Sequence, residues 1–236
     1  MMAEPVIFIP GMLCDARLFL HQILQLSQSR AVTVMLPLQA TVEEMSEAVL
    51  EAAPAKVALV GHGLGGDVAL DVFRRAPERV SRMALIASNP MAETPQLAAA
   101  REARMVGARM GRIAQVALDE IPPGALAPLE TRDATLALLQ EMAVGLGADA
   151  FLGQSRAMQR RPDQQKVMRR AMLPVLILAG RLDTVVPLRR QDFLSALMPY
   201  GRLQIIEDAG HLAPLEQPEA VTAALRAFLD GPSSVR

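Results

Sequence analysis

Residues 57–70 read VALVGHGLGGDVAL, an apolar run followed by a glycine-rich turn and a second apolar segment. A short apolar run that ends at glycine is typical of a buried strand, and the length and spacing of the residues after the turn favour a helix. Glycine also permits the close approach of a strand and a helix. The segment therefore predicts a strand, a sharp turn centred on Gly63 and a helix, which is one unit of an α/β protein.

Strands alternate with helices on both sides of a long central segment. The residues after Thr41, with Glu44 at capping-box spacing, predict an amphipathic helix to about Ala53. Six apolar runs have the length of buried strands: 5–10, 31–37, 56–60, 82–87, 174–180 and 202–206. This alternation predicts a mostly parallel sheet flanked by helices and joined by right-handed crossovers.

The central segment, residues 91–172, contains no strand-like run. Ala, Leu, Met, Arg and Gln dominate it, and prolines and glycines interrupt it at several points. We expect several short helices here, inserted between two strands of the sheet. The chain is thus predicted to have a core formed by residues 1–90 and 173–236, with an all-helical insertion at 91–172.

Composition excludes several classes of function. The 236 residues carry a formal net charge of −1, with no Trp and one Tyr, so neither a basic surface nor stacking platforms for nucleic acid are expected. The single cysteine rules out an internal disulfide, and three scattered histidines lack metal-ligand spacing. The N-terminal MMAEPVIFIP has no signal-peptide pattern and no membrane-span length, which favours a cytoplasmic protein.

The glycine turn also matches a dinucleotide-binding motif. Gly61, Gly63 and Gly66 satisfy G-x-G-x-x-G between a strand and a helix. That motif requires an acidic residue at the end of the next strand to hold the ribose, whereas Ser88 and Asn89 follow that strand here. The fingerprint is therefore incomplete.

Two later segments place reactive side chains directly after predicted strands. Asp183 follows the run that ends at Gly180, and His211 follows the next run within EDAGHLAPLEQPE. Ligands of open parallel sheets bind outside the carboxyl ends of the strands. We therefore expect Gly63, Asp183 and His211 to converge at this edge.

The chain order of glycine turn, acid and histidine resembles that of the α/β-hydrolases over residues 4–230. It is most similar to small bacterial esterase-like members with a helical cap, and the α/β-hydrolase fold is implied. That family has G-x-S-x-G at its nucleophile turn, whereas residues 61–65 read G-H-G-L-G. Every position fits except Gly63, which stands where the family keeps its serine nucleophile.

The resemblance assigns roles to several residues. His211 would be the general base, and Asp183 would orient its imidazole and stabilise the imidazolium. The backbone N–H groups of Leu64 and Met12 would form the oxyanion hole. The implied substrates are apolar carboxylic esters, thioesters or lactones, and this acyl transfer requires no cofactor.

Gly63 leaves three interpretations open. The glycine was introduced in place of serine, which inactivates the enzyme; or the chain is a natural ligand-binding protein on a hydrolase scaffold; or it is a serine-independent enzyme that uses His211. Other candidate groups have simpler explanations. Cys14 is expected to be a small buried hydrophobe, and His62 is expected to point away from position 63 and to be structural.

The inserted helices would cover the mouth of the site. Six apolar residues of this segment are candidates for the pocket lining, although each could instead pack in the helix core: Met91, Met105, Met110, Met142, Phe151 and Met158. The segment 160–170, RRPDQQKVMRR, has five basic residues and one acid. It is either a solvated helix face or a docking surface for an anionic acyl carrier or coenzyme A conjugate.

Overall fold

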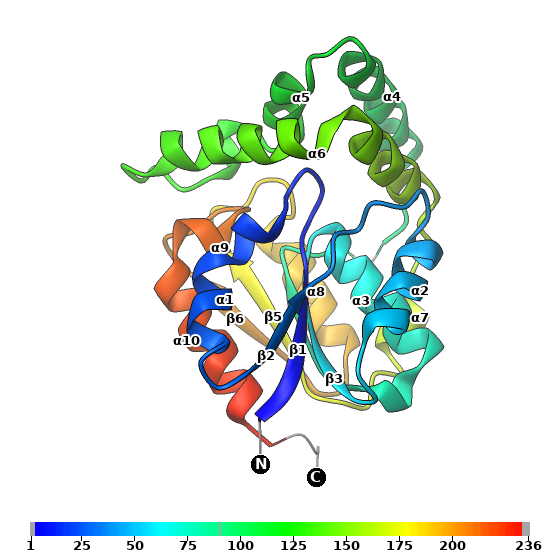
Figure 1. Ribbon diagram of the computed structural model, residues 1–236, viewed down its shortest axis with the longest axis vertical. Helices are drawn as coiled ribbons and strands as arrows, with labels where there is room; N and C mark the ends of the chain where they lie inside the picture. The colour runs from blue at the N-terminus through cyan, green and yellow to red at the C-terminus, as the bar shows by residue number, and fades with distance from the viewer. Residues whose placement is uncertain (1–2, 90, 233–236) are drawn as a thin grey trace.

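The computed structural model describes residues 3–89 and 91–232. Six strands form one fully parallel sheet in the order β2-β1-β3-β4-β5-β6 (Figure 1). The strands are β1 (Ala3–Ile9), β2 (Arg30–Val34), β3 (Val57–His62), β4 (Val80–Ile86), β5 (Val175–Gly180) and β6 (Gly201–Ile206). The predicted parallel α/β sheet is confirmed, and each strand overlaps the apolar run that predicted it.

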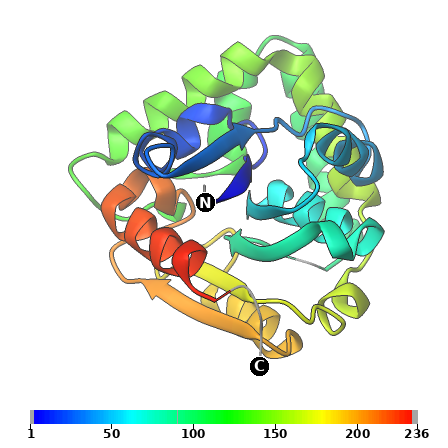
Figure 2. The same cartoon turned by 60° about the horizontal axis from the view of Figure 1, so that its bottom comes forward.

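Alternate residues of the central strands enter two separate cores. Phe8 and Val60 pack on one face of the sheet, whereas Ile7 and Leu59 pack on the other. All four side chains are fully buried because helices cover both faces. In Figure 2 the last helix, drawn in red, lies across the sheet from the cyan helices that follow β2 and β3.

The helices of the core follow the predicted alternation. They are α1 (Leu20–Leu26), α2 (Val42–Ala52), α3 (Leu64–Arg75), α8 (Leu188–Leu197), α9 (Ala213–Glu216) and α10 (Pro218–Asp230). Helices α1, α9 and α10 pack on one face, and α2, α3 and α8 pack on the other. The Thr41 hydroxyl accepts a hydrogen bond from the Glu44 N–H at 3.1 Å, so the predicted cap does begin α2.

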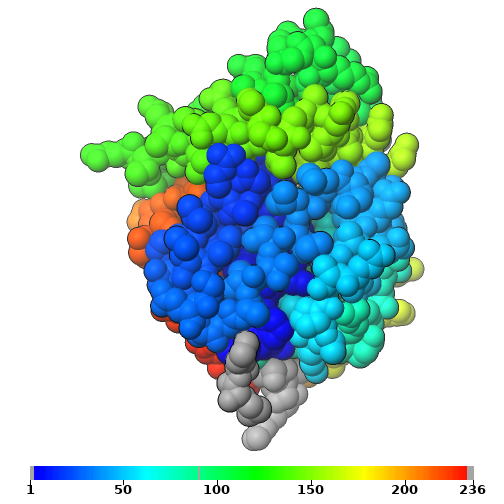
Figure 3. All heavy atoms as spheres, in the orientation of Figure 1, coloured from blue at the N-terminus to red at the C-terminus, as the bar shows by residue number. Residues whose placement is uncertain are grey.

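The inserted segment is helical throughout its regular structure and lies above the carboxyl ends of the strands (Figure 1). Its helices are α4 (Pro95–Arg109), α5 (Ile113–Glu120), α6 (Arg132–Arg160) and α7 (Gln165–Met168). Figure 3 shows the light-green part of this segment resting on the blue N-terminal residues. At Gly153 the contact is so close that an added Cβ would lie 2.8 Å from the Leu38 carbonyl oxygen.

Helix α6 has the length and composition of a membrane span, but its backbone is broken within it. Gly147 has φ 82° and ψ 173°, outside the helical region, and is one of the glycines expected to interrupt this segment. Neither half then reaches the ~20 continuous helical residues that a span requires. The part before Gly147 contacts α5, where Gln140 donates to the Ala114 carbonyl at 3.2 Å. The part after it contacts α4, where Gln159 donates to the Ala98 carbonyl at 3.1 Å.

Candidate functional site

The glycine turn joins β3 directly to α3. Gly63 has φ 51° and ψ −118°, a conformation that side chains rarely adopt, and its N–H donates to the Ile86 carbonyl at 3.0 Å. Two residues later the helix touches β1, since a Cβ on Gly65 would lie 1.9 Å from the Ile9 carbonyl oxygen. The local glycines therefore produce a sharp turn and a close strand–helix contact.

Asp183 and His211 meet beyond the ends of β5 and β6. Nδ1 of His211 lies 2.9 Å from Oδ2 of Asp183, and both residues are buried. The other Asp183 oxygen accepts hydrogen bonds from the N–H groups of Val185 and Val186 at 2.8 and 2.9 Å. The loop after β5 thus fixes the carboxylate, and the carboxylate orients the imidazole.

The Asp183 carboxylate also determines the charge preference of His211. Burial disfavours the imidazolium, but the attraction and hydrogen bond of Asp183 outweigh burial, so the pKa of His211 is raised. The carboxylate accepts from Nδ1–H in the neutral ring, which leaves the lone pair on Nε2. No described residue forms a hydrogen bond with Nε2.

The loop that carries His211 is held by Glu216. Its carboxylate accepts three backbone hydrogen bonds, from Ala127, Gly210 and Leu212, at 2.7 to 2.8 Å. The His211 N–H donates to the Ala125 carbonyl at 2.8 Å. Residues 125–127 precede α6, so the histidine loop is joined directly to the inserted segment.

His62 lies against the histidine loop instead of pointing away from the site. Its Nε2 is 2.8 Å from the backbone oxygen of His211, and the two rings pack edge to face at 5.0 Å. Burial and the neighbouring His211 lower the pKa of His62 to about 3. His62 is therefore neutral, donates through Nε2–H, and lines the same cavity as His211.

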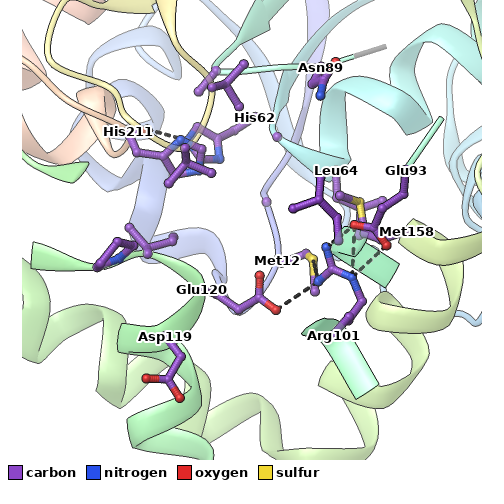
Figure 4. A pocket seen from close by; sticks show the side chains of 18 of the residues that line it. Met12, His62, Leu64, Asn89, Glu93, Arg101, Asp119, Glu120, Met158 and His211 are labelled. Atoms are coloured by element: carbon purple, nitrogen blue, oxygen red, sulfur yellow. Dashed lines mark hydrogen bonds and ion pairs between the residues drawn. The ribbon is translucent and has the colours of Figure 1, made fainter. Parts of the chain in front are cut away.

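A cavity of about 370 Å³ lies between the sheet edge and the inserted helices. Figure 4 shows the labelled side chains around it, with His211 and His62 on one side and Arg101 on the other. Gly63 and His211 line the cavity, and Asp183 supports the histidine from behind. One part of the wall is apolar: Met12, Leu64, Ile121, Met158 and Val186.

The backbone N–H groups of Leu64 and Met12 lie at the cavity and have no acceptor among the described residues. Leu64 is the first residue of α3, where N–H groups have no partner within the helix. The neighbouring Leu13 N–H is instead engaged, since it donates to Oε1 of Gln154 at 3.0 Å. Gln154 belongs to α6, so its bond to Leu13 joins the Met12 loop to this helix. The same side chain also donates to the Pro37 carbonyl at 3.1 Å.

The opposite wall contains an ion-pair network that sequence patterns do not predict. Arg101 is bound to Glu93 at 2.6 Å and to Glu120 at 2.9 Å, and Arg104 is bound to Glu120 at 2.7 Å. Four charged residues within an Ala-rich helical segment look like solvated surface, and no local spacing signals that they meet. They were therefore not identifiable without the packing of α4 on α5.

The apolar residues proposed for the lining are mostly elsewhere. Of the six, Met158 lines the cavity. Met105, Met142 and Phe151 are buried in the core, and Met110 is 67% exposed. Met91 is also outside the lining. Apolar periodicity identifies the apolar face of a helix but not the direction in which that face points, so core packing and pocket lining could not be separated for these residues. Cys14 is buried as expected, and burial raises the pKa of its thiol to about 12, so it is not a thiolate.

The basic segment 160–170 is not a single helix. Helix α6 ends at Arg160, and α7 spans only Gln165–Met168. Arg161 is buried and binds the Asp67 carboxylate at 2.9 Å, so it is not part of any docking surface. Four basic side chains of the segment remain exposed: Arg160, Lys166, Arg169 and Arg170.

Within residues 3–89 and 91–232 no three His, Cys, Asp or Glu side chains are grouped to hold a metal ion. The chemistry that this arrangement offers is a buried carboxylate–imidazole pair together with two unengaged backbone donors at the cavity, one at the start of α3 and one in the loop after β1. Such groups can remove a proton at one side of a ligand and stabilise negative charge at the other.

Comparison with known proteins identifies similar chains. The sequence profile of the alpha/beta hydrolase family matches residues 6–224. A pimeloyl-[acyl-carrier protein] methyl ester esterase of Aromatoleum aromaticum is 30% identical over 190 residues, which are 76% of each chain. An esterase of Thermogutta terrifontis with bound malate has a TM-score of 0.87 at 24% identity, covering 97% of this chain and 90% of its own. The enol-lactonase of Burkholderia xenovorans has a TM-score of 0.86 at 19% identity, covering 97% and 92%.

Proposed function

Because this chain belongs to the alpha/beta hydrolase family, whose profile covers most of its length, we propose that its cavity is a carboxylic ester site in which Gly63 occupies the nucleophile position. The observation that carries the proposal is the 2.9 Å bond between His211 and Asp183 beside this glycine. In the proposed site His211 is the base, Asp183 holds its tautomer, and the Leu64 and Met12 N–H groups bind the oxyanion.

Position 63 is a glycine and has no side chain, which has a defined chemical consequence. In a serine hydrolase the base removes the hydroxyl proton while the serine oxygen attacks the acyl carbon, and the same proton then passes to the leaving alcohol. Gly63 has no oxygen to attack, so no acyl-enzyme forms. Binding and oxyanion stabilisation alone leave about 10³–10⁴-fold acceleration over water. In this proposal the chain with Gly63 is therefore an impaired esterase.

The backbone at Gly63 is compatible with a serine in that position. Its φ of 51° imposes a strain of about 1–3 kcal/mol on a residue with a side chain, and glycine relieves this strain. A Cβ built there is 3.8 Å from its nearest neighbour, the Cα of Gly11, so space for a side chain is present. The turn thus supports an inactivated hydrolase, in which a serine was exchanged for glycine.

Two alternatives follow from the same geometry. A cavity with no attacking side chain is suited to a ligand-binding protein. The unpartnered Nε2 of His211 is instead suited to a serine-independent enzyme, in which the imidazole takes a proton from water or from the substrate. These alternatives differ from the main proposal in one respect: restoring serine at position 63 would not increase their activity.

The substrate class follows from the relatives and the cavity. One relative is an esterase of pimeloyl-[acyl-carrier protein] methyl esters, and one structural neighbour is an enol-lactonase. We propose that the substrate of this chain is a carboxylic ester, thioester or lactone. One form of this substrate would be a conjugate with an acyl carrier or coenzyme A. The exposed Lys166, Arg169 and Arg170 would then contact the anionic carrier. Unchanged kinetics of the Arg169→Glu/Arg170→Glu variant on a carrier-linked ester would remove the docking role.

The decisive experiment compares the chain with its Gly63→Ser variant on p-nitrophenyl esters of increasing chain length. The esterase proposal requires a large gain in kcat/KM with serine, lost again in Gly63→Ser/His211→Ala. Gly63→Ala is the matched control, because it adds the Cβ without the oxygen. If serine brings no gain in a folded protein, the esterase proposal fails and the two alternatives remain.

A further inference from the structure

The ion-pair network on the cavity wall leaves one carboxylate oxygen unused. Oε1 of Glu120 accepts a hydrogen bond from Arg101 at 2.9 Å and forms an ion pair with Arg104 at 2.7 Å. No described residue donates a hydrogen bond to Oε2 of the same side chain. Two arginines thus hold the carboxylate in place, while one of its oxygens is available to a ligand.

Figure 4 shows where this carboxylate points. Glu120, the last residue of α5, projects into the cavity between His211 and Arg101. Its charge reaches the histidine, since Glu120 is among the groups that raise the pKa of His211. The side chain is only 11% exposed, so a ligand in the cavity would meet the oxygen with little competition from bulk water.

Each arginine of the cavity is already paired with a carboxylate of the protein. Arg101 uses its guanidinium on Glu93 and Glu120, and Arg104 binds Glu120. Arg161, the third arginine of the lining, is paired with the buried Asp67. A carboxylate on the ligand would compete with Glu93, Glu120 or Asp67 for these guanidinium groups and would lie beside the Glu120 charge. A hydrogen-bond donor would bind Oε2 of Glu120 and leave the pairs intact.

We propose that Glu120 is a specificity-determining residue, whose free oxygen accepts a hydrogen bond from an ammonium, hydroxyl or amide N–H group on the substrate chain. This inference rests on the proposed function, because it takes the cavity to be an ester site. It adds that the preferred ester carries a donor group away from the reacting carbonyl, and that an ester with a carboxylate there is disfavoured.

The test measures binding to the full chain with Gly63, so it does not depend on turnover. Isothermal titration calorimetry would compare three methyl esters of one chain length: methyl 6-aminohexanoate, methyl hexanoate and monomethyl adipate. A hydrogen bond to a buried charge predicts about tenfold tighter binding of the amino ester than of methyl hexanoate, with monomethyl adipate weakest. Glu120→Gln should remove most of this preference.

Two further variants separate a specific contact from loss of structure. Glu130→Gln removes the same charge from an exposed position of the inserted segment and should keep the preference. Glu120→Asp keeps the charge beside Arg101 but withdraws the oxygen by one carbon, and should lose it. Equal binding of all three esters, tightest binding of monomethyl adipate, or an unchanged preference in Glu120→Gln would each overturn the inference. If the esters bind without preference but serine at position 63 restores turnover, only the role of Glu120 fails.

Discussion

His211 and Asp183 lie 28 positions apart in the sequence, yet their side chains share a 2.9 Å hydrogen bond in a buried environment. The bond exists because β5 and β6 are parallel neighbours, so the loops that follow them leave the sheet at the same edge. Each partner has its own support, from the Val185 and Val186 amides for the acid and from Glu216 for the histidine loop. The pair is therefore preorganised before any ligand binds.

The first prediction concerns the tautomer of His211. In the Gly63→Ser variant, Asp183→Asn should lower kcat/KM by about 10⁴-fold, because an amide no longer holds the proton on Nδ1. Steady-state hydrolysis of a p-nitrophenyl ester measures the change. Asp208→Asn alters an exposed acid of the same loop as His211 and should have little effect. Equal losses in the two variants would contradict the role of Asp183.

The second prediction concerns pH. His211 acts as a base only when neutral, and its pKa is raised by Asp183 against the opposing effect of burial. Activity of Gly63→Ser should therefore increase with pH through a midpoint above the ordinary histidine value of about 6.5. Asp183→Asn should move the midpoint of its residual activity downward, since the carboxylate that favours the imidazolium is lost. The pH profile of kcat/KM tests both statements, and a midpoint below 6 in Gly63→Ser would refute the first.

Sequence patterns were sufficient for the sheet and for the residues at its edge. Apolar runs indicate the strands, and their alternation with helices indicates a parallel sheet. Parallel strands bring their carboxyl ends to one edge, which placed Asp183 and His211 together. The turn at Gly63 could also be predicted from the sequence, because glycine favours sharp turns. Its φ of 51° is a conformation in which other residues are strained.

The inserted segment was much less predictable. Its helices were expected, but the residues that face the cavity depend on how α4, α5 and α6 pack, and local periodicity does not record this. Arg101 and Glu120 are 19 positions apart on different helices, and Arg161 pairs with Asp67 across 94 positions. One arginine of the basic segment 160–170, Arg161, is therefore part of a buried ion pair that the sequence pattern does not indicate. The charged residues of the cavity wall could not be predicted from local sequence either.

The third prediction tests the close contact of α3 with β1. Gly65→Ala should destabilise the protein by about 3 kcal/mol, because the new Cβ would lie 1.9 Å from the Ile9 carbonyl oxygen, which belongs to the backbone and cannot move freely. Gly124→Ala is the control, since no atom lies within 4 Å of a Cβ built there. Urea unfolding of the two variants gives the free energies. If Gly65→Ala is as stable as the control, α3 does not lie as close to the Ile9 carbonyl of β1 as this contact requires.

The fourth prediction concerns the buried pair of Asp67 and Arg161. Burial raises the pKa of Asp67 from 3.8 to about 6, although Arg161 opposes this shift. The folded state therefore binds more protons than the unfolded state between these pH values, and this carboxyl makes the protein less stable as pH rises through that window. Removing the arginine should make the effect larger, since the carboxylate would then be buried without its cation.

Arg161→Met should accordingly destabilise the protein by about 3 kcal/mol at pH 8, where Asp67 is ionised, and by clearly less at pH 5, where it can take up a proton without loss of structure. Urea unfolding at the two pH values measures the difference. Arg160→Met, the exposed neighbour, should change stability by little at either pH. The double variant Asp67→Asn/Arg161→Met removes the titrating group, so its stability relative to Asp67→Asn should not depend on pH. A pH-independent loss in Arg161→Met alone would mean that the arginine contributes by packing and not by charge.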